Sequence, residues 1–476
     1  MAAKFGTSGL RGLSSELVGS VSALYSTAFA RFLLSGGLAS PGSPVVVARD
    51  FRQSSPEIAS TVMGALIRAG LKPIDCGTIP TPALALYGQS IGAAGIMITG
   101  SHIPADRNGI KFYRPDGEIA KTDEAAITEA AALLAGDEVA NRVEAGVAED
   151  HEEKASRLFL DRNMAILPAG SLKGKRIGVY QHSTVARDMM VKVFEHYGAT
   201  VFPLGRSEQF IPVDTEAVSD ETIRLLAGWS DELSLDAIIS TDGDGDRPLV
   251  TDEHGLPLRG DLLGLVAARF LGANVVATPV TSNSGIETAG DFKVVRTRVG
   301  SPFVIAAMDE ALASGESKVI GFEANGGLML GSDFSIGSTT LKALPTRDSF
   351  LPALAILGIA AENPQTLSAV ARTFSLPIAL ADRLENYATE RSAALMAYLR
   401  SSPDCLSDFL TSLGTVKSTS DIDGLRVTLG DDSIIHFRPS GNAPEMRCYV
   451  EAADEDAAQA LLEKGLGLLG GWQRIA

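Results

Sequence analysis

The sequence has few cysteines and little positive charge, and each shortage excludes a class of protein. Its 476 residues include only three cysteines, Cys76, Cys405 and Cys448, which lie far apart and form no C-x-x-C pair. A disulfide framework and a cysteine-bound zinc site are therefore excluded, and we expect a reducing compartment. The formal net charge of −17 argues against a nucleic acid or an anionic membrane as partner, because both attract a basic surface.

Long hydrophobic runs and a secretory signal are also missing. The longest uncharged apolar run, residues 350–361, contains Pro352 and is shorter than the roughly 20 residues that span a bilayer. The opening M-A-A-K-F-G-T-S-G-L-R-G has no apolar segment typical of a signal peptide. We expect a cytoplasmic protein that does not bind a membrane and that is a monomer or a homodimer.

The length and the order of the predicted elements indicate an α/β protein of several domains. Single hydrophobic cores stop growing at about 250–300 residues, and this chain is longer. Apolar runs alternate with helical patterns in three successive sets, whose predicted strands are 45–50, a short one through Ile74, 94–99, 176–180, 199–204, 235–239, 274–277, 293–297 and 318–321. After residue 373 the alternation has period two, over 424–429, 433–437 and 446–450, and a helix follows from 454 to about 466.

We therefore predict three similar α/β domains with mixed sheets and a C-terminal α+β domain around a central cleft. The predicted boundaries are 1–150, 151–256, 257–370 and 371–476. The helical, acidic and alanine-rich stretch 122–154 is interpreted as a linker region.

Three aspartates alternate with glycines in S-T-D-G-D-G-D-R, which ends at Arg247. An extended backbone would turn the carboxylates of Asp242, Asp244 and Asp246 to one side, where their mutual repulsion calls for a cation. Their oxygens are hard ligands and favour Mg²⁺ over softer metals. Arg247 adds a second cation, which suits a multiply charged anion such as phosphate.

Other interpretations of this loop are weaker. An EF-hand needs glycine at the sixth position and a preceding helix, whereas Arg247 is sixth and residues 235–239 predict a strand. A phosphatase loop with Asp242 as nucleophile would have Thr or Val in place of Asp246. An acidic surface turn explains one Asp-Gly pair, but not three carboxylates in register followed by an arginine.

Polar loops also follow the predicted strands that end at Thr99 and Gly321, at the sheet edge where open α/β folds bind ligands. The loop R-P-S-G-N-A-P-E-M-R over 438–447 is a plausible phosphate cradle, because arginine binds phosphate bidentately and glycine exposes backbone N–H groups. A match to G-x-G-x-x-G at 465–470 lies at the end of the last helix and leaves no room for a βαβ unit, so it predicts no dinucleotide site.

Together these loops resemble the α-D-phosphohexomutase family, which includes phosphomannomutases, phosphoglucomutases and phosphoglucosamine mutases. The likeness covers essentially the whole chain, because four motifs occur in the family's order and spacing. Residues 99–104 match the family's T-A-S-H-N-P, 242–247 match D-G-D-x-D-R, 321–326 match G-E-x-S-G and 438–444 match R-P-S-G-T-E-P. The departures are Gly100 for Ala, Ile103 for Asn, Phe322 inserted before Glu323, Asn325 for Ser, and Asn442-Ala443 for Thr-Glu.

The resemblance implies a mutase that moves phosphate between C1 and C6 of a hexose phosphate through phosphoserine at Ser101 and a hexose 1,6-bisphosphate. One Mg²⁺ would be bound by Ser101, Asp242, Asp244 and Asp246. It assigns catalysis to Arg11, Ser101, His102, Lys111 and Arg247, substrate binding to Gly300, Ser301, Glu323 and Asn325, and phosphate binding to Arg438, Ser440, Gly441, Asn442 and Arg447. His102 and Lys111 are both candidates for moving the proton.

The loop E-A-N-G-G resembles that of bacterial phosphomannomutases, so interconversion of mannose 6-phosphate and mannose 1-phosphate is the expected activity. Phosphoglucomutase or phosphoglucosamine mutase activity is the alternative within the family. A phosphatase and a sugar-phosphate sensor that binds without turnover are the alternatives outside it.

Overall fold

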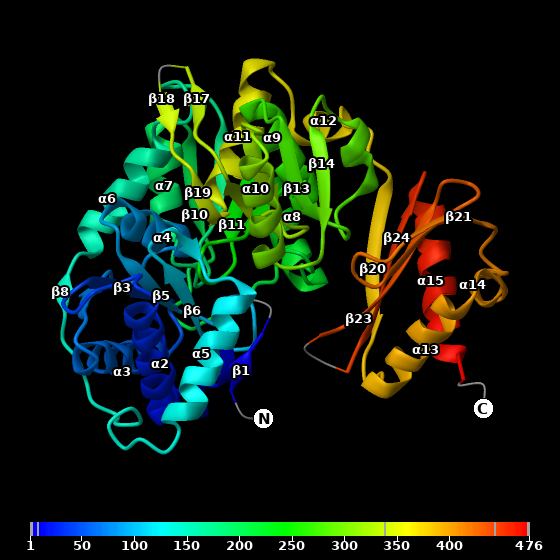
Figure 1. Cartoon of the computed structure of the whole chain (residues 1–476). Coiled ribbons are helices and arrows are strands. Elements are labelled where there is room, and N and C mark those ends of the chain that lie inside the picture. Colours follow the sequence, from blue (N-terminus) through cyan, green and yellow to red (C-terminus); the bar gives the residue numbers. More distant parts are fainter. Residues whose placement is uncertain (1–2, 7–8, 338, 442–443, 474–476) are drawn as a thin grey trace.

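The structure is a computed structural model that describes residues 3–6, 9–337, 339–441 and 444–473. Three α/β units lie close together, and a fourth unit, drawn orange to red in Figure 1, lies at one side of them. The first three units contain mixed sheets and the fourth contains an antiparallel sheet. The predicted fold class is therefore confirmed, whereas the exact domain boundaries stay a prediction.

The first unit is built on an eight-stranded sheet in the order β1-β2-β6-β5-β3-β4-β8, with β7 paired to β6. Strands β3, β4, β5 and β8 are parallel, and β6, β2 and β1 extend the sheet in antiparallel fashion. Its elements are β1 (Lys4–Phe5), β2 (Leu10–Leu13), α1 (Ser14–Glu16), η1 (Leu17–Val21), α2 (Ser22–Ser35), β3 (Pro44–Arg49), α3 (Ser55–Arg68), β4 (Lys72–Asp75), α4 (Thr81–Ser90), β5 (Ala94–Ile98), β6 (Arg107–Arg114), β7 (Gly117–Glu118), α5 (Lys121–Leu134) and β8 (Glu149–Asp150).

The interpretation of residues 122–154 as a linker is wrong. Helix α5 packs against α2, and its Ile127 and Ala131 are buried in the core of the first unit. Strand β8 then pairs with β4 and joins the sheet. The acidic, alanine-rich composition concealed this, because small alanines let a helix approach its neighbour closely with only a few large apolar side chains.

The second unit has a four-stranded sheet in the order β10-β9-β11-β12, with only β12 antiparallel. Its elements are α6 (Glu152–Asn163), β9 (Arg176–Tyr180), α7 (Arg187–His196), β10 (Thr200–Leu204), α8 (Asp220–Leu233), β11 (Ala237–Thr241) and β12 (Pro248–Val250).

The third unit has a five-stranded sheet in the order β14-β13-β15-β16-β19 and a separate pair, β17-β18. Its elements are α9 (Gly260–Leu271), β13 (Val275–Pro279), η2 (Ser284–Thr288), β14 (Lys293–Thr297), α10 (Ser301–Ala313), β15 (Val319–Phe322), β16 (Leu328–Leu330), β17 (Phe334–Ile336), β18 (Thr339–Leu341), β19 (Leu344–Asp348), α11 (Phe350–Glu362) and α12 (Leu367–Arg372).

The fourth unit has an antiparallel sheet in the order β20-β24-β23-β22-β21. Its elements are β20 (Ile378–Leu384), α13 (Thr389–Ser401), α14 (Pro403–Leu410), β21 (Val416–Ser420), β22 (Leu425–Leu429), β23 (Ile434–Pro439), β24 (Met446–Ala452) and α15 (Glu455–Gly471).

The hydrophobic cores divide the molecule differently from the sheets. One cluster runs through the first three units and contains, for example, Val46, Ile239 and Leu354. The fourth unit has a cluster of its own, from Tyr387 to Leu469. The first three units are thus bound together by shared apolar packing, and the fourth is attached to them mainly by polar contacts such as those of Ser284 with Glu451 and Asn283 with Pro377.

Among the described residues, one helical stretch, Ser14–Ser35, is long and apolar enough by composition to cross a membrane. Its backbone leaves the helical conformation at Val18 and Gly19, so that α2 itself is 14 residues long. Phe29, Ala30 and Leu33 of α2 are fully buried in the core of the first unit. Within this fold, α2 is therefore a core helix.

Candidate active site

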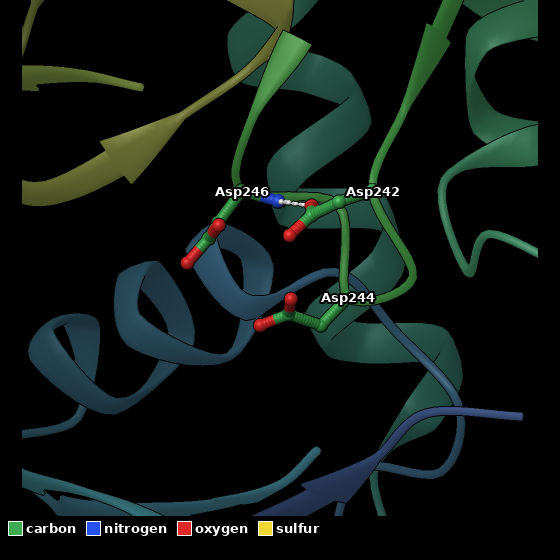
Figure 2. A group of neighbouring side chains, drawn as sticks. All are labelled: Asp242, Asp244 and Asp246. Atoms are coloured by element: carbon green, nitrogen blue, oxygen red, sulfur yellow. Dashed lines mark hydrogen bonds between the residues drawn. The ribbon is translucent and has the colours of Figure 1, made fainter. Parts of the chain in front are cut away.

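Asp242, Asp244 and Asp246 lie in the loop between β11 and β12, and all three are fully buried. Each can offer one carboxylate oxygen such that these oxygens lie within 4.8 Å of one another, and Figure 2 shows the carboxylates around one space. The predicted convergence is correct, but its predicted cause is wrong. The backbone is a turn rather than an extended strand, in which the N–H of Gly245 donates to Asp242 and that of Asp242 donates to Arg247.

Two cations from other units neutralise part of this negative charge. Lys111 of β6 donates to Oδ2 of Asp244 at 2.5 Å and to Oδ2 of Asp246 at 2.7 Å. Arg347 of β19 lies with Nη2 2.8 Å from Oδ2 of Asp246, and its Nη1 lies 2.9 Å from Oε2 of Glu323. The first, second and third units therefore meet at the three aspartates.

The aspartates titrate in opposite directions. Burial, together with the neighbouring Asp244 and Asp246, raises the pKa of Asp242 well above its usual value. Burial alone would also raise the pKa of Asp246, but Arg347 and Lys111 outweigh it and lower the pKa. The loop thus holds one carboxyl that takes up a proton readily and one that remains ionised.

The loop fits a divalent metal ion. Oδ1 of Asp244 and Oδ1 of Asp246 are buried and have no hydrogen-bond partner among the described residues. A buried carboxylate oxygen without a partner is costly, and a hard cation coordinated by both oxygens would remove that cost. Lys111 and Arg347 compensate the opposite oxygens, Oδ2, and leave these two available as ligands.

Ser101 faces the same turn from the loop that follows β5. Its hydroxyl donates to Oδ2 of Asp242 at 2.5 Å, although the two residues are 141 positions apart. The residue is almost fully buried and has a φ of 54°. A non-glycine residue in this left-handed region is strained and needs support from its surroundings.

That support comes from Arg52, which the sequence analysis missed. Its fully buried guanidinium donates to the carbonyls of Ser101, Ile103, Pro104 and Arg107 at 2.6–3.0 Å. Nε also donates to Asp50 at 3.2 Å, and Phe210 covers the guanidinium at 3.9 Å from the ring centre. The charged residues at the end of β3 in A-R-D-F-R were the only signal of this clamp.

The arginine also explains one departure from the family motif. A Cβ atom at Gly100 would lie 2.7 Å from Cζ of Arg52, which is too close for an unmoved guanidinium. Glycine at this position lets the serine loop lie directly on the arginine.

His102 lies between the serine and Arg247. Its Nδ1 lies 2.9 Å from Nη1 of Arg247 and 3.2 Å from Oγ of Ser101. Burial and the charge of Arg247 lower the pKa of His102 to about 3, so the ring is neutral near pH 7. Burial, together with the charges of Arg247 and Arg347, lowers the pKa of Arg11 on β2 to about 10.

The predicted sugar-binding residues divide into two places. Glu323 follows β15 and pairs with Arg347, while Oδ1 of Asn325 accepts from the N–H of Gly327 within the same turn. Ser301, at the start of α10, instead donates to Oε2 of Glu118 at 2.8 Å, next to Gly300. The structure thus places Glu323 beside the aspartates and Ser301 against β7 of the first unit.

The predicted phosphate loop belongs to the fourth unit. Arg438 of β23 and Arg447 of β24 are direct cross-strand partners. Like charges placed opposite each other on two strands repel, and here Arg438 pairs with Asp423 and Arg447 with Glu445. Ser440 is held in the turn by its N–H to the carbonyl of Glu445, Gly441 is exposed, and Asn442 lies outside the described residues.

Models of a known family match two parts of the chain. Residues 2–135 match "Phosphoglucomutase/phosphomannomutase, alpha/beta/alpha domain I" and residues 259–375 match domain III of the same family. A phosphomannomutase of Sinorhizobium fredii is 59% identical over 469 residues, which cover 98% of this chain and 99% of that protein. The chain belongs to the phosphoglucomutase/phosphomannomutase family.

Other members of this family are more distant. A phosphomannomutase of Salmonella muenchen is 42% identical, with 96% of this chain and 94% of that protein covered. A phosphoglucosamine mutase of Brucella ovis is 29% identical, with coverages of 89% and 87%. A family protein of Burkholderia thailandensis has the same fold, with a TM-score of 0.75 at 19% identity, and covers 97% of this chain and 96% of that chain.

Arg347 is the second residue that sequence reasoning missed. It lies in L-P-T-R-D-S-F, near the end of β19 and shortly before the apolar helix α11, and an arginine at this position resembles an ordinary strand end. Its importance becomes visible only when the third unit is placed against the aspartates of the second.

Proposed function

We propose that the protein is a phosphomannomutase that interconverts mannose 6-phosphate and mannose 1-phosphate through phosphoserine at Ser101. The observation that carries this proposal is the 2.5 Å contact of Ser101 Oγ with Asp242 in a buried triple-aspartate loop, in a chain of this family. The close relatives called phosphomannomutases support mannose over the glucosamine alternative.

The transfer needs a nucleophile that both gives and receives a phosphoryl group. A free hydroxyl of the bound hexose phosphate attacks phosphorus on Ser101; the new P–O bond forms as the P–Oγ bond breaks. The proton lost by the hydroxyl ends on Oγ, and the product is a hexose 1,6-bisphosphate. After the bisphosphate turns over, the reverse steps return its other phosphoryl group to Ser101.

His102 and Lys111 are the two candidates for carrying that proton. Nδ1 of His102 lies 3.2 Å from Oγ of Ser101, but it also accepts a hydrogen bond from Nη1 of Arg247. Burial would lower the pKa of Lys111, but Asp244 and Asp246 outweigh this and raise it. Lys111 therefore stays charged and acts, together with Arg11 and Arg247, on the negative charge of the transferred group.

Ser101, Asp242, Asp244 and Asp246 would hold one Mg²⁺. Bound there, the ion withdraws negative charge from the phosphoryl oxygens during transfer. The unpartnered Oδ1 atoms of Asp244 and Asp246 are the feature of this chain that supports the assignment.

The sugar and its second phosphate would be bound by the other two units. Glu323, which pairs with Arg347, would bind the 3- and 4-hydroxyls of the sugar together with Asn325 in the same turn. Gly300 and Ser301, at the start of α10, would also bind the substrate. The phosphate that is not transferred would be bound by the loop residues Arg438, Ser440, Gly441, Asn442 and Arg447, because the two arginines can bind it bidentately. All three cysteines are free, which is consistent with the reducing cytoplasm that we propose as the location. We also propose that the protein is a monomer or a homodimer.

The proposal is tested by locating the phosphoryl group. Phosphopeptide mapping of the purified protein should find it on Ser101, and Ser101→Ala should lose mutase turnover by several orders of magnitude. Label on Asp242 together with release of inorganic phosphate would instead identify a phosphatase, and ligand binding without turnover would identify a sensor. Steady-state kinetics with mannose, glucose and glucosamine phosphates decide the sugar, and a glucose preference above about tenfold would overturn mannose.

A further inference from the structure

Asp423 lies on the turn between β21 and β22, where the fourth unit meets the third. Oδ2 of its carboxylate accepts a hydrogen bond from the N–H of Val299 at 3.0 Å, across 124 positions of sequence. The same oxygen lies 3.0 Å from Nε of Arg438 in an ion pair, and both side chains are only 14% exposed. One oxygen therefore contacts a backbone group of the third unit and an arginine of the phosphate loop.

The backbone of the turn that carries Asp423 is held in place by contacts with β23. The carbonyl of Asp423 lies 2.6 Å from Nε2 of the buried His436 on β23. The next residue, Gly424, has a φ of 81°, and a Cβ there would lie 2.4 Å from the carbonyl oxygen of Phe437. The backbone of the turn thus lies directly on β23, and the carboxylate has a defined direction.

Both partners of Asp423 lead to binding residues. Val299 directly precedes Gly300 and Ser301, and Ser301 is bonded to Glu118 of the first unit. Arg438 is the last residue but one of β23, just before the loop that contains Ser440 and Gly441. Its contact with Asp423 is an ion pair and not a hydrogen bond, since Nε of Arg438 has no hydrogen-bond partner among the described residues. The charge of Asp423 holds the guanidinium beside this loop, where its terminal nitrogens can bind a phosphate bidentately.

We propose that Asp423 is a positioning residue that orients Arg438 for the phosphate and holds the fourth unit closed against the 299–301 segment. This rests on the proposed function, because it assumes that a hexose phosphate bridges the two units. Among the described residues the fourth unit shares no apolar cluster with the others, so a polar contact beside the site helps to fix its position. The bisphosphate must also turn over within the site, and a polar contact can open and reform during that step.

Two substitutions separate the two contacts. In Asp423→Asn, the amide oxygen can still accept from Val299, but the charge that orients Arg438 is gone. We expect KM for mannose 1-phosphate to rise about tenfold with kcat nearly unchanged, since the lost contact is made equally in ground and transition states. In Asp423→Ala both contacts are lost, and small-angle scattering should show a more expanded protein that needs more hexose 1,6-bisphosphate to become compact.

Asp421 provides the matched control on the same turn. Its exposed carboxylate pairs with Arg400 at 2.7 Å. Asp421→Asn should match the wild type in KM and in scattering. An unchanged KM in Asp423→Asn would refute the orientation of Arg438, and wild-type compaction in Asp423→Ala would refute the closing contact. Failure of the proposed function looks different, because the wild type itself would then show no mutase turnover.

Discussion

Nζ of Lys111 lies 2.5 Å from Oδ2 of Asp244, although the two residues are 133 positions apart and belong to different units. The lysine is buried and its side chain contacts two carboxylates. It therefore shares the negative charge of the loop with whatever cation the loop binds.

Lys111→Met should separate stability from metal affinity. Without the ammonium, Asp244 and Asp246 lose a buried partner, which should destabilise the metal-free protein by about 3–5 kcal/mol. A divalent cation should then bind more tightly, because a competing charge has been removed. Thermal unfolding in chelator and in Mg²⁺ measures both: the variant should gain more from Mg²⁺ than the wild type, with turnover strongly reduced in each condition. An equal gain in both proteins would contradict this account.

Arg52→Lys should impair transfer more than it impairs folding. A lysine has three donors, whereas Arg52 serves four carbonyls and a carboxylate, so the left-handed conformation of Ser101 loses support. We expect kcat to fall about a hundredfold, as when a reacting group is displaced by about 1 Å. Mass spectrometry can also measure how fast hexose 1,6-bisphosphate phosphorylates Ser101, and this rate should fall in the variant as well.

Arg187→Lys is the control for that substitution. Arg187 is also a buried arginine on an aromatic ring, that of Phe51, and donates to the carbonyls of His182 and Ser207. Neither of these carbonyls belongs to the serine loop, so replacing Arg187 should lower the melting temperature and leave kcat close to the wild-type value. If both variants lost kcat equally, Arg52 would be a general structural residue.

Glu323→Ala should lower kcat/KM for mannose and glucose phosphates together. The two sugars present identical 3- and 4-hydroxyls, and a charged hydrogen bond contributes about 1.5–3 kcal/mol, which corresponds to a loss of roughly 10–150-fold. Glu323→Gln keeps the shape and releases Arg347 from its ion pair, so it should fall between the alanine variant and the wild type. A loss confined to one sugar would show that Glu323 does not read the shared hydroxyls.

Stability should fall as the pH falls below about 6.5, because three histidines are held in neutral form in the folded protein. Burial lowers the pKa of His182 and of His436 to about 4 and that of His102 to about 3, whereas an unfolded histidine has a pKa of about 6.5. The unfolded chain therefore binds more protons between these values, and the free energy of unfolding decreases as the pH falls through them.

The expected decrease between about pH 7.5 and pH 5 is about 2 kcal/mol for each histidine, measured by urea unfolding. Replacing His436 by Gln should remove about a third of this dependence. The exposed His254, whose side chain is 69% exposed, is the control, and its replacement should leave the pH dependence intact.

The sequence predicted those parts of the fold and of the site that depend on local pattern. Strand–helix alternation located β3, β4, β5, β9, β10, β11, β13, β14 and β15, and it missed antiparallel strands such as β6 and β12. The contiguous motif at Asp242, Asp244 and Asp246 indicated a cation site because the three carboxylates are close in sequence. The packing of α5 was not predicted, because its buried residues include the acidic Asp123 and Glu124 and only Ile127 and Ala131 are apolar.

The residues that were missed act over long sequence distances. Arg347 becomes a partner of Asp246 across 101 positions, and Arg52 reaches the serine loop across about 50. A single arginine after a strand is common, so nothing local distinguishes these two. The fold itself selects them, since it places one guanidinium under the serine loop and the other between two carboxylates.

The first three units share one hydrophobic cluster and the fourth has its own, and this difference affects how the protein unfolds and how it can evolve. The first three units are joined by one apolar cluster, beside which the first has a core of its own, so they should lose their structure in a single cooperative transition. The fourth unit buries its own apolar side chains and should unfold as a separate calorimetric unit. Recombination could therefore exchange the fourth unit between relatives without disturbing the chemistry at Ser101, whereas any break within the first three would expose the shared core.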